Sequence, residues 1–480
     1  MAKKSVFISG GGPAGLAAAL LFQQMGWDEI VLAERRANPK DFEKNKSFNY
    51  LFDGRGQKMI RRLGLMDELA ANGVANTSFT MMVVKADGKP NLQEVGIVNP
   101  NRPQAYWTTR RNLLSFLAKA AVDKASDGIT LLYGHSVEGV SEEATTGRVQ
   151  VMVTDAERNE KRFTPDLILA CDGASSTMRE AAAAWPEVPD GHFARTECPS
   201  MAGGMQYKVL NFPPDFDSSD GRVSIDDREL AYAFHSKYSD KTRTGPLFAF
   251  PIAGEDQPRS LNVIRESDHA IWSKNSAEEL LAFLEDSYPQ LNIRELIDAE
   301  EARDFAIMEP GRFPQPQYIE NIIAELGAGE AKTPILLIGD AAHCFPPDLG
   351  LGVNSALEDL ELLALELETN PDWRAASREF ATKRLPENKA LVRLVQTTFP
   401  EQYATRPWAM RRWVAGFMLR LVLHRIAPSI FDKHVMLLSQ DPDIPFSEVE
   451  NRRDKTNLRI YGLGAALASG LAGAAVWSLT

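Results

Sequence analysis

A glycine-rich turn near the N-terminus constrains the fold of this chain more than any other feature. Gly10-Gly11-Gly12-Pro13-Ala14-Gly15 follows the apolar run Val6–Ile8 and precedes an apolar stretch with helical periodicity. In such a motif the first glycine permits a tight turn, Gly12 lets a pyrophosphate approach the backbone, and Gly15 lets the helix pack closely on the strand. Glu34 ends the next apolar run, where a carboxylate can bind ribose hydroxyls. The motif predicts a β-α-β unit that binds an adenine dinucleotide, and it does not distinguish FAD from NAD.

Two further polar turns follow apolar runs much later in the chain. Gly339-Asp340-Ala341-Ala342-His343 comes directly after Ile335–Ile338 and before a leucine-rich helical pattern. A carboxylate at a strand end can bind a sugar-like hydroxyl, and a helix N-terminus offers free amides and partial positive charge. This turn predicts a site for a polyhydroxylated or anionic ligand. The other turn, Cys171–Arg179, contains Asp172-Gly173, and such turns are too common for this one to indicate a ligand alone.

The overall composition excludes several classes of protein. A length of 480 residues allows two or three domains with a large core. The net charge of -12 argues against a nucleic-acid partner, because such proteins usually carry a basic surface. The three cysteines lie far apart and predict neither a disulfide framework nor a metal site.

Hydrophobic periodicity divides the chain into segments with different predicted secondary structure. Residues 1–185 alternate strands with helices, which predicts a parallel sheet covered on both faces. Residues 186–320 contain short alternating stretches typical of an antiparallel sheet, and residues 321–395 return to the first domain. A basic helical region, 396–455, and a C-terminal segment, 456–480, complete the chain. The predicted fold class is therefore α/β, with a Rossmann-like nucleotide-binding domain, an inserted antiparallel substrate sheet and a C-terminal helical region.

The C-terminal part of the chain suggests contact with a membrane. From Ile460 to Leu479 there are twenty residues without a charge, and basic residues precede them. That length suits a membrane-spanning helix with its basic flank in the cytosol. Because most of these residues are small, the alternative is a surface helix or a helix–helix contact. Upstream, residues 402–431 hold five arginines, interleaved aromatic residues and no acidic residue, which is typical of a helix on an anionic membrane surface or of a packing helix with solvated arginines.

In their order and separation, the three polar turns resemble those of the class A flavoprotein monooxygenases, the family of p-hydroxybenzoate hydroxylase. The resemblance implies an FAD-binding domain of three layers, ββα. It also implies that the first turn binds the adenosine and pyrophosphate of FAD, that the Asp172 turn serves FAD and NADPH, and that the Asp340 turn binds the ribityl chain and isoalloxazine. The cofactor-binding residues that it implies are Gly10, Gly12, Pro13, Ala14, Gly15, Glu34, Arg35, Arg110, Val137, Asp172, Asp340, Gly350, Gly352, Val353 and Asn354.

The activity implied by this resemblance is an FAD-dependent hydroxylation that uses NADPH or NADH and dioxygen. An aromatic or lipophilic small molecule would be hydroxylated by a flavin C4a-hydroperoxide, with Pro347 beside the flavin and Tyr106 as the second catalytic residue. We expect a membrane-associated enzyme facing the cytosol, on an organelle outer membrane or the endoplasmic reticulum, or alternatively a soluble cytoplasmic one. Two other functions remain open: a flavin-dependent reductase of the geranylgeranyl-reductase type, and a membrane-tethered flavin-binding protein without turnover.

Within the family, the chain also resembles the kynurenine 3-monooxygenases. The motifs that carry this likeness are Lys46–Tyr50 with Arg55-Gly56, Tyr207–Leu210, Pro213-Pro214 and Arg384-Leu385-Pro386.

The expected substrate contacts are Tyr106, Met81 and Thr398, and two of them depart from the branch. Tyr106 matches a substrate-contacting tyrosine, but Met81 stands where the branch has an arginine that pairs with the kynurenine carboxylate, and Thr398 replaces an asparagine. A buried carboxylate without a cationic partner loses several kcal/mol of binding. The sequence therefore predicts a pocket less suited to an amino-acid zwitterion and better suited to a more lipophilic substrate.

Overall fold

The computed structural model describes residues 3–39, 48–78, 80–94, 99, 102–254, 257–327, 332–399 and 407–479. Lys46 and Ser47, which contribute to the resemblance to kynurenine 3-monooxygenases, lie outside these residues.

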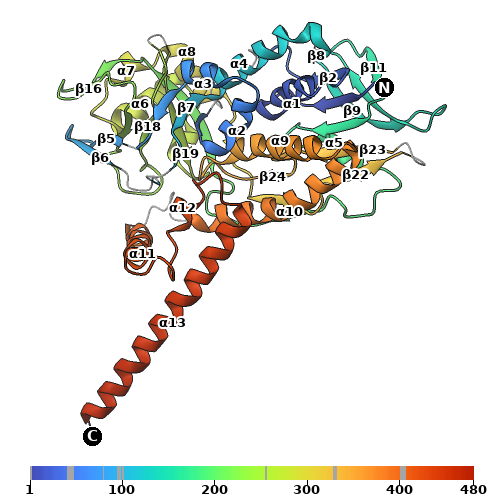
Figure 1. The fold of residues 1–480 in the computed structure, drawn as a ribbon. Helices are drawn as coiled ribbons and strands as arrows, with labels where there is room; N and C mark the ends of the chain where they lie inside the picture. The colour runs from blue at the N-terminus through green and yellow to red at the C-terminus, as the bar shows by residue number, and fades with distance from the viewer. Residues whose placement is uncertain are drawn as a thin grey trace.

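A six-stranded sheet forms the centre of the larger domain (Figure 1). Its strands are parallel except for the edge strand β22, which pairs antiparallel with β23. The central strands are continuous apolar runs, as expected when both faces of a parallel sheet are covered. In spatial order the strands are β22 (Ile323–Leu326), β23 (Thr333–Leu337), β12 (Leu167–Ala170), β1 (Ser5–Ser9), β2 (Glu29–Glu34) and β8 (Ile129–Tyr133).

Two further layers cover this sheet and complete the predicted ββα arrangement. Helix α1 (Pro13–Gln24) packs against both α4 (Arg110–Asp123) and α9 (Gly352–Thr369), and all three join the main core. A three-stranded sheet made of β9 (Ser136–Glu142), β10 (Val149–Thr154) and β11 (Glu160–Phe163) covers the other face, where the rings of Phe163 and Phe7 lie 5.8 Å apart. The predicted α/β fold class is confirmed.

Smaller elements surround this domain. A sheet of β3 (Asn49–Phe52), β7 (Ala105–Thr109) and β4 (Val74–Asn76) lies next to α2 (Gly54–Arg62) and α3 (Met66–Ala71). The remaining elements include α5 (Thr177–Ala183) and the sheet of β13 (Arg195–Glu197), β21 (Gln317–Ile319) and β24 (His343–Cys344).

The substrate domain is a seven-stranded sheet covered on one face by α6 (Ala277–Ser287), α7 (Ile293–Leu296) and α8 (Ala299–Ile307), which share a second core with it. Two of its strands, β5 and β6, come from the segment before residue 186, and β5 pairs parallel with β17. Local sequence patterns did not indicate this, because Met81 pairs with Ala231, far along the chain. In spatial order the strands are β20 (Gly311–Arg312), β14 (Gln206–Phe212), β19 (Arg259–Arg265), β18 (Leu247–Ala249), β17 (Ala231–Phe234), β5 (Thr80–Val84) and β6 (Pro90–Glu94).

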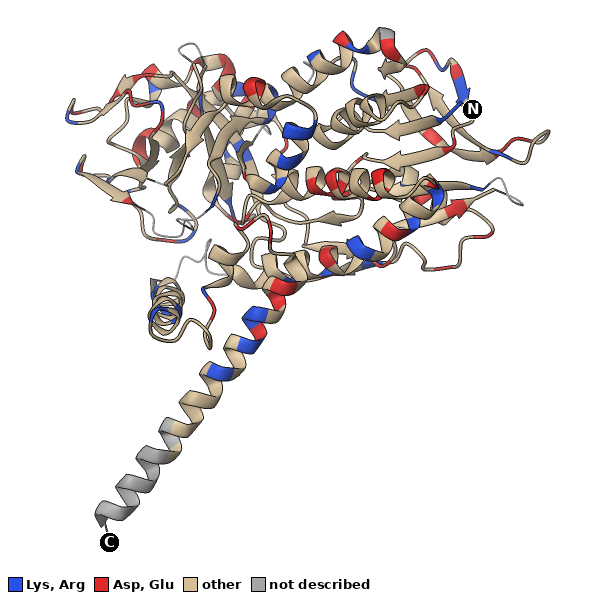
Figure 2. Ribbon diagram, in the orientation of Figure 1, with Lys and Arg blue, Asp and Glu red and all other residues tan. Residues whose placement is uncertain are grey.

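The C-terminal region is helical, as predicted. Its helices are α10 (Trp373–Thr398), α11 (Pro407–Ile426), α12 (Val435–Leu438) and α13 (Phe446–Leu479). A third core joins α10, α12 and the start of α13, and the rest of α13 projects from the body (Figure 1). Acidic and basic residues alternate along the first half of α13 (Figure 2). Among the described residues, no helix combines the length and the apolar character needed to cross a membrane, so the predicted membrane-spanning segment is not supported.

Candidate flavin site

The glycine turn between β1 and α1 leaves space for a ligand at the helix N-terminus. Gly10 has a φ of +101°, and a Cβ on it would lie 2.5 Å from the carbonyl oxygen of Cys171. A Cβ on Gly15 would lie 1.8 Å from the carbonyl oxygen of Gly10, so helix and turn touch there. A Cβ on Gly12, in contrast, would have no atom within 4 Å. The turn is thus closed by backbone contacts behind and open in front of the free amides of α1, which fits a pyrophosphate.

Glu34 provides a charged acceptor beside this turn. Its side chain is buried and accepts hydrogen bonds from the Gly11 amide at 2.7 Å and from the Arg36 side chain at 2.9 Å. Burial alone would raise the pKa of Glu34, but the hydrogen bonds and charge of Arg36 bring it below its ordinary value. Arg36, rather than the exposed and predicted Arg35, is therefore the arginine that holds the expected ribose carboxylate in its ionised form.

The Asp340 turn directly follows β23, at the edge of the main sheet. Asp340 is exposed to solvent, yet desolvation raises the pKa of its carboxyl, while the nearby charges of His343 and Arg110 act to lower it. Tyr50 is only half-buried, and burial likewise raises its pKa, with the charges of Arg110, Asp340 and Arg36 close by. The three polar turns follow β1, β12 and β23, which are neighbours in the main sheet, and the charges of both Arg36 and Asp340 act on Tyr50. We infer that one cleft runs from the Glu34 end to the Asp340 end.

The loop that leads into α9 is held by Asn354. Its amide nitrogen donates to the carbonyls of Leu51 and Gly350, both at 2.8 Å, and its oxygen accepts from the Asp53 amide at 3.0 Å. The side chain of Asn354 is fully used within the protein, so a flavin contact there would come from its backbone. Val353 is also buried, whereas Gly352 begins the helix with free amides. Pro347, the predicted catalytic residue, is exposed, and its carbonyl accepts from the Gly350 amide at 3.0 Å.

A buried network of charges supports the Asp340 turn from behind. Asp359 accepts from the Gly339 amide at 2.7 Å and lies 2.9 Å from the Nε2 of His343. Arg384 donates to Asp359 at 2.6 Å and to Glu358 at 2.9 Å. Burial acts to raise the pKa of Asp359, but the charges of His343 and Arg384 bring it below its ordinary value. The network therefore fixes both ends of the turn through an ionised carboxylate.

Two other predicted cofactor residues lie near the main sheet. One carboxylate oxygen of Asp172 accepts from the Ser9 hydroxyl at 3.2 Å and from the Met178 amide at 3.0 Å. Its second oxygen is buried and has no hydrogen-bond partner in the described part of the protein, which suits a ligand donor. Val137 lies on β9, partly buried against the main core.

The predicted substrate residues, Tyr106, Thr398 and Met81, lie in different parts of the protein. Tyr106 pairs across the strands with the fully buried Phe52 and packs against the main core. Its neighbour Trp107 occupies the other face of β7, where its ring lies 5.1 Å from that of Phe250. Thr398 is fully buried, and its hydroxyl donates to the Leu394 carbonyl at 2.6 Å within its own helix. Tyr106 and Trp107 therefore lie on opposite faces of β7, and Trp107 is the one that contacts the substrate domain.

The substrate sheet turns one face away from helices α6–α8, and we call this its open face. Strand alternation places Met81 there, since Met82 and Val84 belong to the helix side. The ring of Tyr207, also on this face, lies 4.5 Å from that of Phe48, directly before β3. The open face therefore adjoins the strands that flank the cleft. It comprises Met81, Val83, Ala231, Ala233, Phe248, Ser260, Asn262, Ile264, Tyr207, Val209 and Asn211.

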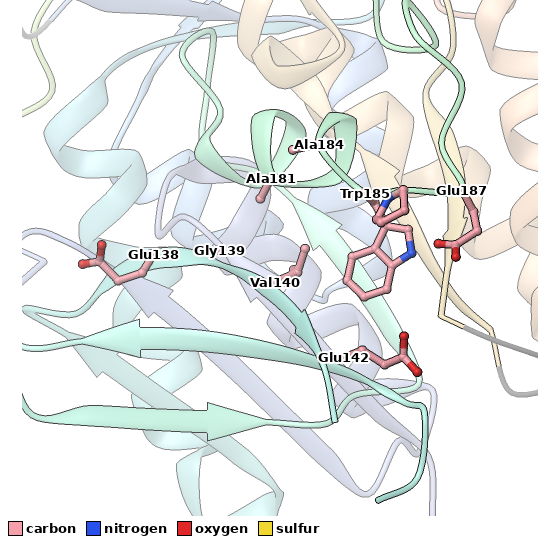
Figure 3. Close-up of a pocket in the computed structure, with 9 residues that line it drawn as sticks. Glu138, Gly139, Val140, Glu142, Ala181, Ala184, Trp185 and Glu187 are labelled. Atoms are coloured by element: carbon pink, nitrogen blue, oxygen red, sulfur yellow. The ribbon is translucent and has the colours of Figure 1, made fainter. Parts of the chain in front are cut away.

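A hollow of about 430 Å³ lies elsewhere, between β9 and α5 (Figure 3). Glu138, Glu142 and Glu187 line it together with Trp185. None of its lining residues belongs to the three polar turns, and its carboxylates do not suit an anionic cofactor.

The chain matches the family model described as FAD binding domain over residues 3–240 and 330–382. Since this match covers more than half of the sequence, the chain belongs to that family, and FAD is its cofactor.

The relatives of this chain include named enzymes. It is 26% identical to the kynurenine 3-monooxygenase of Stenotrophomonas maltophilia (strain K279a) over 409 residues, 83% of this chain and 80% of the relative. It is 26% identical to that of Salinispora arenicola (strain CNS-205) over 479 residues, 98% and 96% of the two chains.

Solved structures share the fold. The p-nitrophenol 4-monooxygenase PnpA of Pseudomonas putida DLL-E4 superposes with a TM-score of 0.61 at 16% identity, covering 86% of this chain and 93% of that one. A tetrameric form of 2-methyl-3-hydroxypyridine-5-carboxylic acid oxygenase gives 0.59 at 18% identity, covering 85% and 95%. At these identities the likeness concerns the fold alone.

Proposed function

We propose that the protein is an FAD-dependent monooxygenase that uses NADPH or NADH and hydroxylates an aromatic or lipophilic small molecule with dioxygen. The observation that carries the proposal is the meeting of the FAD cleft with the open face of the substrate sheet, at the contact between Phe48 and Tyr207. The names of the relatives support the same class, since they are kynurenine 3-monooxygenases.

The residues of this chain bind and position the cofactor and leave its reactive end to the substrate. When bound, FAD supplies the redox chemistry, taking electrons from the nicotinamide co-substrate and activating oxygen. Glu34 would bind the adenosine ribose, Asp340 would bind the ribityl hydroxyls, and the amides that begin α9 at Gly352 would stabilise negative charge on the flavin ring. Pro347, exposed in the same loop, borders the space for substrate and oxygen.

The substrate that this site favours is aromatic and carries no free carboxylate. Met81 lies on the open face, where an arginine would be needed to pair with the carboxylate of an amino acid. An unpaired carboxylate in such a site costs several kcal/mol. L-kynurenine is therefore a poor substrate, although the relatives carry its name.

A substrate panel tests this function. The purified protein is expected to be yellow, and neutral aromatic compounds are expected to stimulate its oxidation of NADPH with incorporation of label from ¹⁸O₂. A colourless protein that FAD cannot reconstitute would contradict the proposal. Turnover without oxygen incorporation would instead indicate a flavin-dependent reductase. Strong stimulation by L-kynurenine, with hydroxylated product, would contradict the role given to Met81.

We further propose that α11 attaches the protein to the surface of an anionic membrane. Its exposed residues combine large apolar side chains with arginines at helical spacing. Arg411 and Arg412 adjoin the apolar set, which is Trp408, Val414, Met418, Leu419, Val422 and Ile426.

Flotation with lipid vesicles tests this attachment. The full-length protein is expected to bind vesicles that contain phosphatidylserine and to release them in high salt, because the arginines act through screened charge. The double variant Trp408→Ser, Met418→Ser should bind more weakly. Equal recovery of both proteins with the vesicles would refute the role of α11.

A further inference from the structure

The two faces of the substrate sheet differ in charge. Lys208, Arg259 and Arg265 all lie on the side of helices α6–α8, since they alternate with the open-face residues of β14 and β19. Each of these cations is buried and donates to backbone carbonyls: Lys208 to Phe305, Arg259 to Pro214 and Asp227, and Arg265 to Ile264 and Pro246. In the described strands of this sheet, no charged side chain lies on the open face.

Asn262 occupies the middle of the open face, between two contacts with the FAD domain. On the same strand and face, Ile264 pairs with Tyr207, whose ring lies 4.5 Å from Phe48. At the other end, the Phe250 amide donates to the Ser260 carbonyl at 3.5 Å, and the ring of Phe250 touches Trp107. The side chain of Asn262 therefore points into the region between the substrate sheet and the strands beside the FAD cleft.

The carboxamide of Asn262 has an acceptor that nothing in the described protein uses. Its side chain is only 6% exposed, and its Oδ1 has no hydrogen-bond partner. The cross-strand neighbours Val209 and Phe248 have no side-chain donor. A buried acceptor without a partner destabilises a protein by roughly 1–3 kcal/mol, so its persistence at an interdomain site points to a ligand donor.

We propose that Asn262 determines substrate specificity by accepting a hydrogen bond from a hydroxyl or amino group on a neutral aromatic ring. This inference rests on the proposed function and names the substrate class of the same site: phenols and arylamines without an ionised carboxylate. The same group that donates to Asn262 also enriches the ring in electrons, and an electrophilic hydroxylation requires such a ring. A hydroxyl or amino substituent therefore favours both binding to Asn262 and hydroxylation of the ring.

Matched pairs of ligands test the proposal on the FAD-loaded full-length protein. Binding is measured from the change in the flavin absorption spectrum for a phenol and for the methoxy analogue that lacks the donor. The wild type is expected to bind the phenol about tenfold more tightly or better, since one hydrogen bond to a buried acceptor contributes about that factor. Asn262→Leu is expected to bring the ratio close to one.

Two further variants make the result specific. Asn262→Asp keeps an acceptor and is expected to retain a preference for the donor-bearing ligand. Asn211→Leu, on the same face, is the control, because the Asn211 amide already donates to Glu301 at 3.0 Å and accepts from Ser260 at 3.2 Å. This control is expected to leave the ratio unchanged.

The outcomes separate this inference from the proposed function. An unchanged ratio in Asn262→Leu, with FAD content and thermal stability intact, would overturn the inference and leave the monooxygenase proposal standing. Failure of every phenol and arylamine to bind the wild type would overturn the assigned substrate class. Binding with the expected ratios, but without NADPH-dependent oxygen incorporation, would contradict the proposed function and leave the role of Asn262 intact.

Discussion

Arg55 joins the FAD domain to the C-terminal region, and its removal should destabilise the whole protein. It is 2% exposed and donates to Glu358 at 2.7 Å, to the Asp441 carbonyl at 2.7 Å and to the Ile444 carbonyl at 2.6 Å. Its guanidinium also lies 4.1 Å from the ring centroid of Phe446. In Arg55→Met the apolar volume is kept, but Glu358 retains a single cationic partner and the carbonyls of Ser439, Asp441 and Ile444 lose their donor.

The expected cost follows from the burial of the pair. Removing one partner of a buried ion pair typically costs about 3–5 kcal/mol, because the remaining charge stays out of water. Arg384 still pairs with Glu358, and the carbonyls of the C-terminal segment can bind water, so we expect about 3 kcal/mol. The segment around residues 439–446 should also become more sensitive to proteolysis.

Arg62→Met provides the matched control. Arg62 lies on the same helix α2, forms two hydrogen bonds with Glu361 of α9 at 2.8 and 2.9 Å, and also pairs with Glu368, but these side chains remain partly exposed. Because water still reaches these charges, we expect their loss to cost about 1–2 kcal/mol, less than the loss of Arg55. Urea denaturation of the two FAD-loaded variants, followed by flavin fluorescence and circular dichroism, measures the difference. A loss in Arg55→Met no larger than that in Arg62→Met would refute the assigned role of Arg55.

Two further predictions concern the FAD domain. The variant Gly12→Ala should fold but bind FAD more weakly, because the new Cβ meets no protein atom and would occupy the space for the pyrophosphate. The variant Gly15→Ala should instead reduce folding, because its Cβ would collide with the Gly10 carbonyl. Soluble yield and FAD titration distinguish the two effects. Burial raises the pKa of Asp53 from 3.8 to about 6, so the folded protein holds this proton more tightly than the unfolded chain. Its contribution, about 3 kcal/mol for two pKa units, is complete below the ordinary pKa and is lost as the pH rises through about 6. Asp53→Asn should therefore flatten the decline in thermal stability between about pH 4 and pH 7, and an unchanged decline would contradict this origin.

The parts of the site that could be predicted from sequence are those built by neighbouring residues. Gly10–Gly15 and the Asp340 turn each combine a strand end, a turn and a helix start within a few residues, so their geometry is local. The FAD cleft follows once the parallel sheet brings these strand ends to one edge.

The remaining features depend on contacts that a linear pattern does not contain. The pairing of Glu34 with Arg36 depends on how the chain turns after β2, and the contact of Trp107 with Phe250 depends on which face of β7 meets the substrate domain. The acceptor of Asn262 becomes visible only when both faces of β19 are known. Charge pairs such as Arg55 with Glu358 join residues about 300 positions apart, where local propensity carries no information.

The parallel pairing of β5 with β17 has a consequence for how this protein is made and altered. Ala231 is synthesised about 150 residues after Met81, so β5 cannot pair with β17 until that part of the chain has been made. During that interval the apolar strand β5 has an open edge on the nascent chain, where chaperones or other strands can engage it. The same pairing means that a chimera exchanging only residues 186–320 would join strands of one parent to the edge hairpin of another. Transplanting substrate selectivity between relatives therefore requires residues 80–94 to travel with the rest of the sheet.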